Sequence, residues 1–326
     1  MVDPGNEPFF IVGSPRSGTT LLRFLLCSHP RIFIPDETGF IPFLLKSRAI
    51  DEKLTLRRFE GLIERMGRLN YQWKGIVNDS ATLYRSLPSP TLGSLLDAVF
   101  RKTAKDHNAS RWGDKTPLYV RYIPLLKTLF PRARFIHMIR DGRDATISAQ
   151  DKWGISEKPY MDNFYLLKNW VDNVSIGRQA GSVLGADDYL EVRYEELVAN
   201  VETSVKAVCD FLGEAYSPEM LDQTRVAKEL GPGPDDHWEA MERITSKSVE
   251  RWRKEMSEFD LKLANRIAGG LLRELGYGAP IELPFSGREE ARFRILSGKY
   301  QITSTVRKWL YATGLVSLNR KMRRRI

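Results

Sequence analysis

Eight residues near the amino terminus, GSPRSGTT at positions 13–20, combine groups that bind phosphate esters. The two glycines and the final threonine match the phosphate-binding loop G-x-x-x-x-G-K-[ST], whose lysine reaches the outer phosphates of a nucleoside triphosphate. Thr19 occupies the lysine position, and the loop carries its cation at Arg16 instead. An apolar segment precedes the loop and a helical pattern follows it, so backbone N–H groups and a helix dipole would converge on an anion. The pattern predicts an anion site, with a plain strand-to-helix turn as the alternative.

The missing lysine makes a kinase or an ATPase a weaker interpretation. Those enzymes also use Mg²⁺ to neutralise a highly charged triphosphate. A phosphosulfate carries less charge on its transferable group, which Arg16 and the loop amides could bind without a metal. An ATP-dependent P-loop kinase and a non-catalytic, membrane-associated nucleotide-binding protein remain the two alternatives.

Two later motifs accompany segments that have the pattern of strands. ARFIHMI is an apolar run that leads to Arg140, and Ser148 lies two turns into the helical pattern that comes next. Arg140 could bind a phosphate through its fork of donors, or form a surface salt bridge with a neighbouring aspartate. RWGDKTP is a short strand or turn that presents Lys115, for which an ion pair with Asp114 is the alternative.

Three segments, taken in order, resemble the sulfotransferases that use 3′-phosphoadenosine 5′-phosphosulfate (PAPS). They are PFFIVGSPRSGTTLLRFLLCSHPRIFIPDETGF, GDKTPLY and RFIHMIRDGRDATISAQ, and the similarity is greatest to the tyrosylprotein and heparan-type branch. The resemblance runs from about residue 8 to residue 275. It implies a P-loop three-layer α/β fold, with a central parallel sheet flanked by helices.

The resemblance also implies a nucleotide site in four parts. The first loop would bind the 5′-phosphosulfate, and the motif after ARFIHMI would bind the 3′-phosphate. A tyrosine in VRYEEL would line the adenine pocket, and the late segment SVERWRKEM would close over the nucleotide. The residues that take these roles are, in chain order, Arg16, Ser17, Gly18, Thr19 and Thr20, then Arg140 and Ser148, then Tyr194, and last Ser248, Arg251 and Trp252.

Transfer of a sulfuryl group to an alcohol needs a base for the hydroxyl proton and a cation for the oxygen that leaves. Glu37, in PDETGF, matches the catalytic glutamate of the resembling branch, although a helix cap or a solvated acid would also explain it. His29 is the competing base, because another branch uses a histidine; a helix C-terminal dipole explains it equally well. Lys115 matches the lysine that stabilises the bridging oxygen, and Arg16 could share this work.

Strand-like and helical patterns alternate along the chain, which is typical of a parallel sheet covered on both faces. The helical patterns include residues 54–67, 90–106 and 258–275, one from 119 to 131 and one from 195 to 213. The stretch GPGPDD has the composition of a surface loop. We expect residues 1–285 to form the α/β domain and residues 286–326 to form a basic extension.

The composition is that of an ordinary globular protein, with 42% hydrophobic and 28% charged residues. No apolar run approaches the roughly 20 residues that would cross a bilayer. The first residues include an acid where a signal peptide is basic. We therefore expect a cytoplasmic protein, with Cys27 and Cys209 reduced.

The formal charge of +9 lies at the carboxyl end. Residues 286–326 contain eleven Lys/Arg and two Asp/Glu, so the rest of the chain sums to zero. A solvated basic end is the simplest interpretation, and peripheral contact with an anionic membrane, folding back on the domain and capping of an oligomer are the others. Nucleic-acid binding is not expected, because no reading motif is present.

We expect a PAPS-dependent sulfotransferase that needs no metal. The acceptor is expected to bind through the segments 38–110 and 150–185. Carbohydrate, glycolipid, peptidyl tyrosine and small alcohols all remain open as acceptors, and the sequence does not predict an oligomeric state.

Overall fold

The computed structural model describes residues 6–44, 50–153, 161–222, 246–278 and 284–312. GPGPDD, predicted to be a surface loop, lies outside the described residues. The chain forms two compact units, the first comprising residues 1–140 and 173–247 and the second residues 141–172 and 248–326. The predicted boundary after residue 285 stays a prediction.

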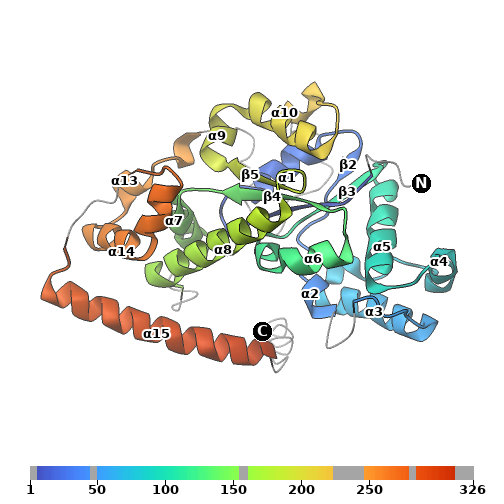
Figure 1. The fold of residues 1–326 in the computed structure, drawn as a ribbon, viewed down its shortest axis with the longest axis horizontal. Coiled ribbons are helices and arrows are strands. Elements are labelled where there is room, and N and C mark those ends of the chain that lie inside the picture. The colour runs from blue at the N-terminus through green and yellow to red at the C-terminus, as the bar shows by residue number, and fades with distance from the viewer. Residues whose placement is uncertain (1–5, 45–49, 154–160, 223–245, 279–283, 313–326) are drawn as a thin grey trace. The chain divides into compact units, whose positions relative to one another are not determined.

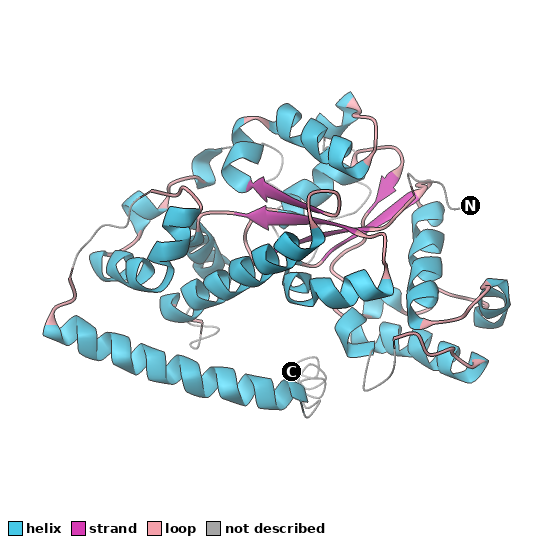
Figure 2. Ribbon diagram, viewed as in Figure 1, coloured by secondary structure: helices cyan, strands magenta, loops and turns pink. Residues whose placement is uncertain are grey.

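Five parallel strands form the sheet of the first unit, as far as the structure describes it, in the order β2-β3-β1-β4-β5. Figures 1 and 2 show helices flanking this sheet, with α9 and α10 on one side and α6 on the other. The predicted α/β fold with a parallel sheet between helices is confirmed. The strands are Phe9–Gly13 (β1), Ile32–Phe33 (β2), Arg111–Lys115 (β3), Arg134–Ile139 (β4) and Tyr189–Arg193 (β5).

The all-parallel arrangement brings the carboxyl ends of the strands to one edge of the sheet, where open α/β sheets bind their ligands. Strand β1 lies between β3 and β4, and all of its residues are buried. The register pairs Ile11 with Lys115 on one side and with Ile136 on the other. The three segments that carried the resemblance therefore begin on the adjacent strands β1, β3 and β4.

Helices of the first unit surround this sheet. The structure divides two helices that the sequence pattern predicted to be continuous, one just before Pro124 and the other at Asn200. A proline inside a helix lacks an N–H group and clashes with the preceding turn, so residues 119–131 divide into a 3₁₀ turn, Pro117–Tyr122, and α6. Asn200 has an extended φ of −139° and separates α9 from α10. The helices are Thr19–Cys27 (α1), Ile41–Leu44 (α2), Leu56–Leu69 (α3), Ser80–Ser86 (α4), Leu92–Asp106 (α5), Ile123–Leu129 (α6), Tyr194–Ala199 (α9) and Val201–Leu212 (α10).

The core of the first unit is built on aromatic side chains between the sheet and helices α3, α5 and α6. Trp112 stacks on Phe100 with ring centroids 4.4 Å apart, and Phe10 meets Trp112 edge to face at 5.9 Å. The indole N–H of Trp112 donates to Asp97 Oδ1 at 2.9 Å, so its polar atom is satisfied inside the core. This packing holds β3 and β1 rigidly beneath their loops.

The second unit consists of helices among the residues described. Phe164 and Leu167 of α8 pack with Leu263 and Ala264 of α14, and α15 adds further apolar side chains to this cluster. The helix α8 contributes residues 163–172 to this unit. The elements are Gly142–Trp153 (α7), Asn163–Leu184 (α8), Trp252–Glu255 (α13), Glu258–Glu274 (α14) and Gly287–Ala312 (α15).

Candidate active site

The phosphate-type loop joins the end of β1 to the start of α1, as the sequence predicts. Arg16 has a φ of 68° and Gly18 a φ of 88°, so the loop turns twice through the left-handed region. A Cβ atom at Gly18 would lie 2.4 Å from Cδ2 of Tyr194, and one at Gly13 would lie 2.5 Å from the carbonyl oxygen of Met138. Both glycines are therefore required by the close approach of neighbouring groups.

The side chain of Ser17 is a candidate for ligand binding. Its hydroxyl is fully buried and has no hydrogen-bond partner among the residues described. Buried hydroxyls are normally paired, so a donor that stays unpaired in a loop at a helix N-terminus fits a phosphate or sulfate oxygen. The loop therefore contains a hydrogen-bond donor that suits an oxygen of a phosphosulfate.

Arg140 joins the end of β4 to the loop. Its side chain is buried, Nη1 donates to the carbonyl oxygen of Arg16 at 3.0 Å, and the guanidinium lies 4.4 Å from the ring centroid of Tyr194. The same tyrosine ring packs against Gly18. The structure thus brings together three predicted nucleotide residues, from the loop, from β4 and from the start of α9.

Lys115 links the loop to the predicted base. Its ammonium donates to Glu37 Oε1 at 2.7 Å and to Thr20 Oγ1 at 3.2 Å. The lysine side chain is 5% exposed, and that of Glu37 is 51% exposed. The alternative ion pair of Lys115, with Asp114, is replaced by one with Glu37. Lys115 therefore connects the carboxylate of Glu37 to the first turn of α1.

A buried hydrogen-bond chain fixes the residue next to Glu37. Thr38 donates to Asp114 Oδ2 at 2.6 Å and lies 2.7 Å from the hydroxyl of Tyr119, which accepts from the backbone N–H of Ile41 at 3.0 Å. Burial raises the pKa of Asp114 to about 6, although the threonine hydrogen bonds oppose this rise. Burial also raises the pKa of Tyr119. These residues were not predicted, and the one available signal was that Asp114 and Thr38 each adjoin a predicted catalytic residue.

Asn70 supports the same segment from the other side. Its Nδ2 donates to the carbonyl oxygen of Glu37 at 3.0 Å, and its Oδ1 accepts from the backbone N–H of Gln72 at 3.2 Å. The side chain thereby ties the backbone of Glu37 to the 3₁₀ turn Tyr71–Trp73, which follows α3. The position of the predicted base is thus set by hydrogen bonds on both sides.

His29, the competing base, is held by two hydrogen bonds at the other end of α1. Nδ1 accepts from the backbone N–H of Arg31 at 3.2 Å, so Nε2 carries the proton and donates to the carbonyl oxygen of Ala215 at 2.9 Å. The loop lies before Thr19, whereas His29 follows Cys27, about 14 Å further along a helix that rises about 1.5 Å per residue. His29 therefore lies at the end of α1 that is remote from the loop.

The second unit contains four of the predicted nucleotide residues. Ser148 is buried in α7, and Trp252 is buried at the start of α13. Arg251 pairs with Glu255 at 2.7 Å and with Asp151 at 2.9 Å, and these hydrogen bonds raise the pKa of its guanidinium. The fourth residue, Ser248, ends a 3₁₀ turn. Their roles stay predictions.

Two residues of RDGRDATIS that were not predicted as site residues hold the late segment of the second unit. Asp144 accepts from the backbone N–H of Glu250 at 2.7 Å and from that of Trp252 at 2.9 Å. Arg143 stacks on the ring of Trp252 at 3.6 Å and pairs with Asp141 at 2.6 Å. Asp141 and Asp144 thus each bind a partner in this unit. Asp144 fixes the backbone on both sides of Arg251.

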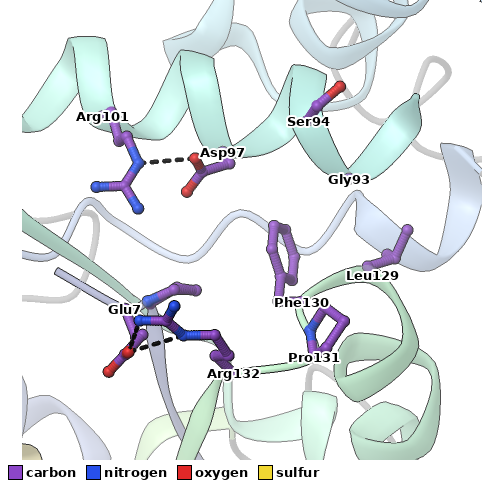
Figure 3. Close-up of a pocket in the computed structure, with 10 residues that line it drawn as sticks. Glu7, Gly93, Ser94, Asp97, Arg101, Leu129, Phe130, Pro131 and Arg132 are labelled. Atoms are coloured by element: carbon purple, nitrogen blue, oxygen red, sulfur yellow. Dashed lines mark hydrogen bonds and ion pairs between the residues drawn. The ribbon is translucent and has the colours of Figure 1, made fainter. Parts of the chain in front are cut away.

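A separate pocket of about 300 Å³ lies at the amino ends of β1 and β4 (Figure 3). Figure 3 shows Phe130 and Pro131 facing α5, with the ion pairs Arg101–Asp97 and Arg132–Glu7 at its margin. Strand ends at this edge are opposite to the loop, and no predicted site residue lines the pocket. Its charged residues are paired, so we assign it no role in the chemistry.

No group of three or more His, Cys, Asp and Glu side chains is placed to hold a metal ion in the part of the chain that the structure describes. None of the helices in the described ranges is both long enough and apolar enough to span a bilayer.

An all-parallel sheet whose first strand runs through a glycine-bearing anion loop into a helix defines a P-loop α/β protein. Comparison with known proteins specifies the family. The sulfotransferase family profile matches residues 8–218, and the chain belongs to this family of enzymes. The predicted family and the predicted enzyme class are both confirmed.

Individual relatives cover most of the chain. Protein-tyrosine sulfotransferase A of Caenorhabditis elegans is 26% identical over 302 residues, which are 87% of this chain and 71% of the relative. Nodulation protein NoeE of Sinorhizobium fredii is 26% identical over 82% of this chain and 65% of its own length. The solved sulfotransferase domain of the curacin biosynthetic pathway has a TM-score of 0.58 at 21% identity, and it covers 84% of this chain and 99% of its own. This last likeness supports the fold.

Proposed function

We propose that the protein transfers a sulfuryl group from PAPS to an acceptor hydroxyl. The observation that carries the proposal is the position of Lys115 Nζ, which hydrogen-bonds both to Thr20 in the first turn of α1 and to Glu37. A cation there adjoins the loop that would hold the phosphosulfate and the acid that would receive a proton. The unpaired buried hydroxyl of Ser17 supplies an independent donor for the same oxygens.

Each residue of this cluster has a chemical task in the proposed reaction. PAPS, when bound, supplies an activated sulfuryl group and releases adenosine 3′,5′-bisphosphate. The carboxylate of Glu37 accepts the acceptor's hydroxyl proton while the oxygen forms its bond to sulfur. The ammonium of Lys115 stabilises the negative charge left on the oxygen that loses its bond to sulfur, and Arg16 assists. Arg140 and Tyr194 orient the nucleotide, together with the residues of the first loop.

Among acceptors, we propose the phenolic hydroxyl of peptidyl tyrosine. The support is the similarity to protein-tyrosine sulfotransferases of Caenorhabditis elegans and Gallus gallus, each 26% identical over more than four fifths of this chain. The half-exposed carboxylate of Glu37 is also reachable by an acceptor that is part of a larger molecule. Carbohydrate, glycolipid and small alcohol acceptors are the other outcomes of the test.

Nucleotide binding and sulfuryl transfer distinguish the proposed sulfotransferase from an ATP-dependent kinase and from a non-catalytic nucleotide-binding protein. Adenosine 3′,5′-bisphosphate should raise the melting temperature in the presence of a chelator, and ATP with Mg²⁺ should raise it much less. The reverse order would identify an ATP-dependent enzyme instead. The variant Glu37→Gln should keep the nucleotide-induced shift and lose transfer by about 10²-fold or more, which is typical of removing a general base. Undiminished transfer by this variant would exclude Glu37 as the base.

The acceptor is identified by labelled transfer to a panel. We expect ³⁵S from PAPS to appear on an acidic tyrosine peptide and not on the same peptide with phenylalanine in place of tyrosine. A glycan, a glycolipid and a simple alcohol complete the panel. Labelling of one of these in preference to the peptide would retain the sulfotransferase and reject the tyrosine acceptor.

A further inference from the structure

Helix α15 of the second unit presents apolar side chains on two faces. Phe293, Leu296 and Tyr300 pack into the apolar cluster of this unit. Phe293 and Tyr300 approach Phe164 with ring centroids 5.5 and 5.7 Å apart. This first face explains why the helix lies on α8 and α14. It does not explain the apolar residues on the other face.

The second face is a stripe of three exposed residues, which we name the outer stripe. Ile295 is 71% exposed, Ile302 is 67% exposed and Val306 is 49% exposed. Their spacings of seven and four residues place them above one another on one side of a helix. Single exposed apolar residues are common on protein surfaces, but a row of β-branched side chains along a helix indicates a contact surface.

A cation adjoins the outer stripe, while the acids of α15 are engaged elsewhere. Arg288 lies seven residues, about two helical turns, before Ile295, is exposed, and forms no ion pair with the residues described. Arg292 is also exposed, but its guanidinium stacks on Phe259 of α14 at 4.0 Å and so belongs to the packed face. The two acids of the helix point to α14, where Glu289 pairs with Lys262 and Glu290 with Arg266.

The charge of the whole segment favours an anionic partner. Residues 307–326 add seven Lys/Arg and no Asp/Glu, and the net charge of the chain equals that of residues 286–326. A second copy docked through the same stripe would bring two such cationic segments together, which charge repulsion opposes. A nucleic-acid backbone would satisfy the cations but would gain nothing from isoleucine and valine.

We infer that the outer stripe of α15 docks on an anionic lipid surface. A helix with this pattern lies in the plane of the interface, with its apolar side chains below the headgroups and its cations beside anionic lipids. The packed face would remain on the second unit, so the enzyme would bind the membrane peripherally. The inference does not depend on the proposed acceptor or on the proposed catalytic residues.

Vesicle flotation of the full chain tests this inference. We expect the protein to float with phosphatidylcholine vesicles that contain about one third phosphatidylserine, to stay in solution with pure phosphatidylcholine, and to be released by salt. The variant Ile295→Ser/Ile302→Ser/Val306→Ser should lower the partition coefficient at least tenfold. Isoleucine, valine and serine have similar helix propensities, so the helix itself should persist.

Matched variants distinguish the stripe from other surface features. Val183→Ser changes an apolar residue that is 83% exposed on α8, and it should leave flotation unchanged. Arg288→Gln should lower the partition coefficient roughly fivefold, as expected for one cation near a charged surface. All variants should keep the melting temperature of the original chain, because the altered side chains are exposed.

Three results would overturn the inference. The first is absence of flotation with anionic vesicles, and the second is equal flotation of the triple variant and the original chain. The third is a dimer in sedimentation analysis that the triple variant converts to a monomer without any effect of lipid. That result would assign the stripe to a second copy of the chain.

Discussion

Lys115 Nζ lies 2.7 Å from Glu37 Oε1, so the two groups expected to act on opposite ends of the reaction neutralise each other in this structure. The same ammonium also reaches Thr20. When a phosphosulfate occupies the loop, its oxygens would compete for the lysine, and the carboxylate would be released to act as a base. The arrangement therefore favours binding of the sulfuryl donor before the acceptor is deprotonated.

Replacing Lys115 by methionine should lower kcat by about 10² to 10³-fold, because a preorganised charge at the departing oxygen is lost. The carboxylate of Glu37 is half exposed, so water can replace the lysine, and the free energy of unfolding should change by less than about 1 kcal/mol. Steady-state transfer assays and urea titrations measure the two quantities. The control Lys127→Met breaks an ion pair with Asp188 away from the loop, and should leave kcat unchanged.

Replacing Gly18 by alanine should destabilise the protein by more than about 1 kcal/mol and abolish the nucleotide-induced thermal shift. The new Cβ would meet the ring of Tyr194 and would stand at a φ that L-residues avoid. Gly61 offers the control, because it lies inside α3 with no atom within 4 Å of a new Cβ. Gly61→Ala should stabilise the protein by about 0.5–1 kcal/mol. Equal effects of the two changes would contradict the loop geometry.

Asp114 should make the stability of the protein depend on pH. Its pKa of about 6 in the folded state lies above the usual 3.8. Between about pH 4 and pH 6 the folded state holds a proton that the unfolded chain has released, so this contribution to the free energy of unfolding falls as the pH rises. The difference between the two values corresponds to about 3 kcal/mol at about 1.4 kcal/mol per pH unit.

Urea unfolding of the original chain and of Asp114→Asn, each at pH 4.5 and pH 7, measures this contribution. The asparagine of the variant cannot titrate. The original chain should therefore exceed the variant in free energy of unfolding by more at pH 4.5 than at pH 7. Parallel pH profiles for the two proteins would show that burial does not shift this carboxyl group. The same variant should lower kcat more than it raises KM, because Thr38 loses a charged acceptor beside Glu37.

Replacing Asp144 by asparagine should loosen the late segment of the second unit. A carboxylate accepts from the backbone N–H groups of both Glu250 and Trp252, whereas the amide has a single acceptor oxygen. We expect hydrogen exchange at these two amides to become faster by about tenfold or more. A tenfold increase corresponds to a decrease of about 1.4 kcal/mol in the free energy of local opening. Asp172→Asn, which alters an ion pair with Lys168 on α8, should leave both amides as protected as before.

The sequence predicted most of the fold because β1 and β4 are apolar runs that end at recognisable motifs. GSPRSGTT, GDKTP and RDGRDATIS each follow or overlap a buried strand, and parallel strands bring such ends together. Glu37 and Lys115 were each predicted as catalytic residues, but the ion pair between them was not predicted. The division of the two helices at Pro124 and Asn200 was missed, because apolar periodicity continues across each break.

The parts of the site that were not predicted depend on contacts between distant residues. Thr38 meets Asp114 and Tyr119 across separations of 76 and 81 residues, and a fully buried strand gives no alternation to show which side chain faces which helix. Asp144 likewise binds amides 106 and 108 residues away. The helix α15 was missed for a different reason: it has apolar residues on opposite faces, which obscures helical periodicity.

The side-chain amide of Asn70 bears on how the choice of acceptor could change in evolution. It connects the backbone of Glu37 to the turn Tyr71–Trp73, within the stretch expected to contact the acceptor. On the proposed assignment, a substitution in that stretch would alter which acceptor binds, while the Asn70 side chain keeps Glu37 beside Lys115. An enzyme with such a hydrogen bond can change its acceptor specificity in evolution while its catalytic residues keep their positions.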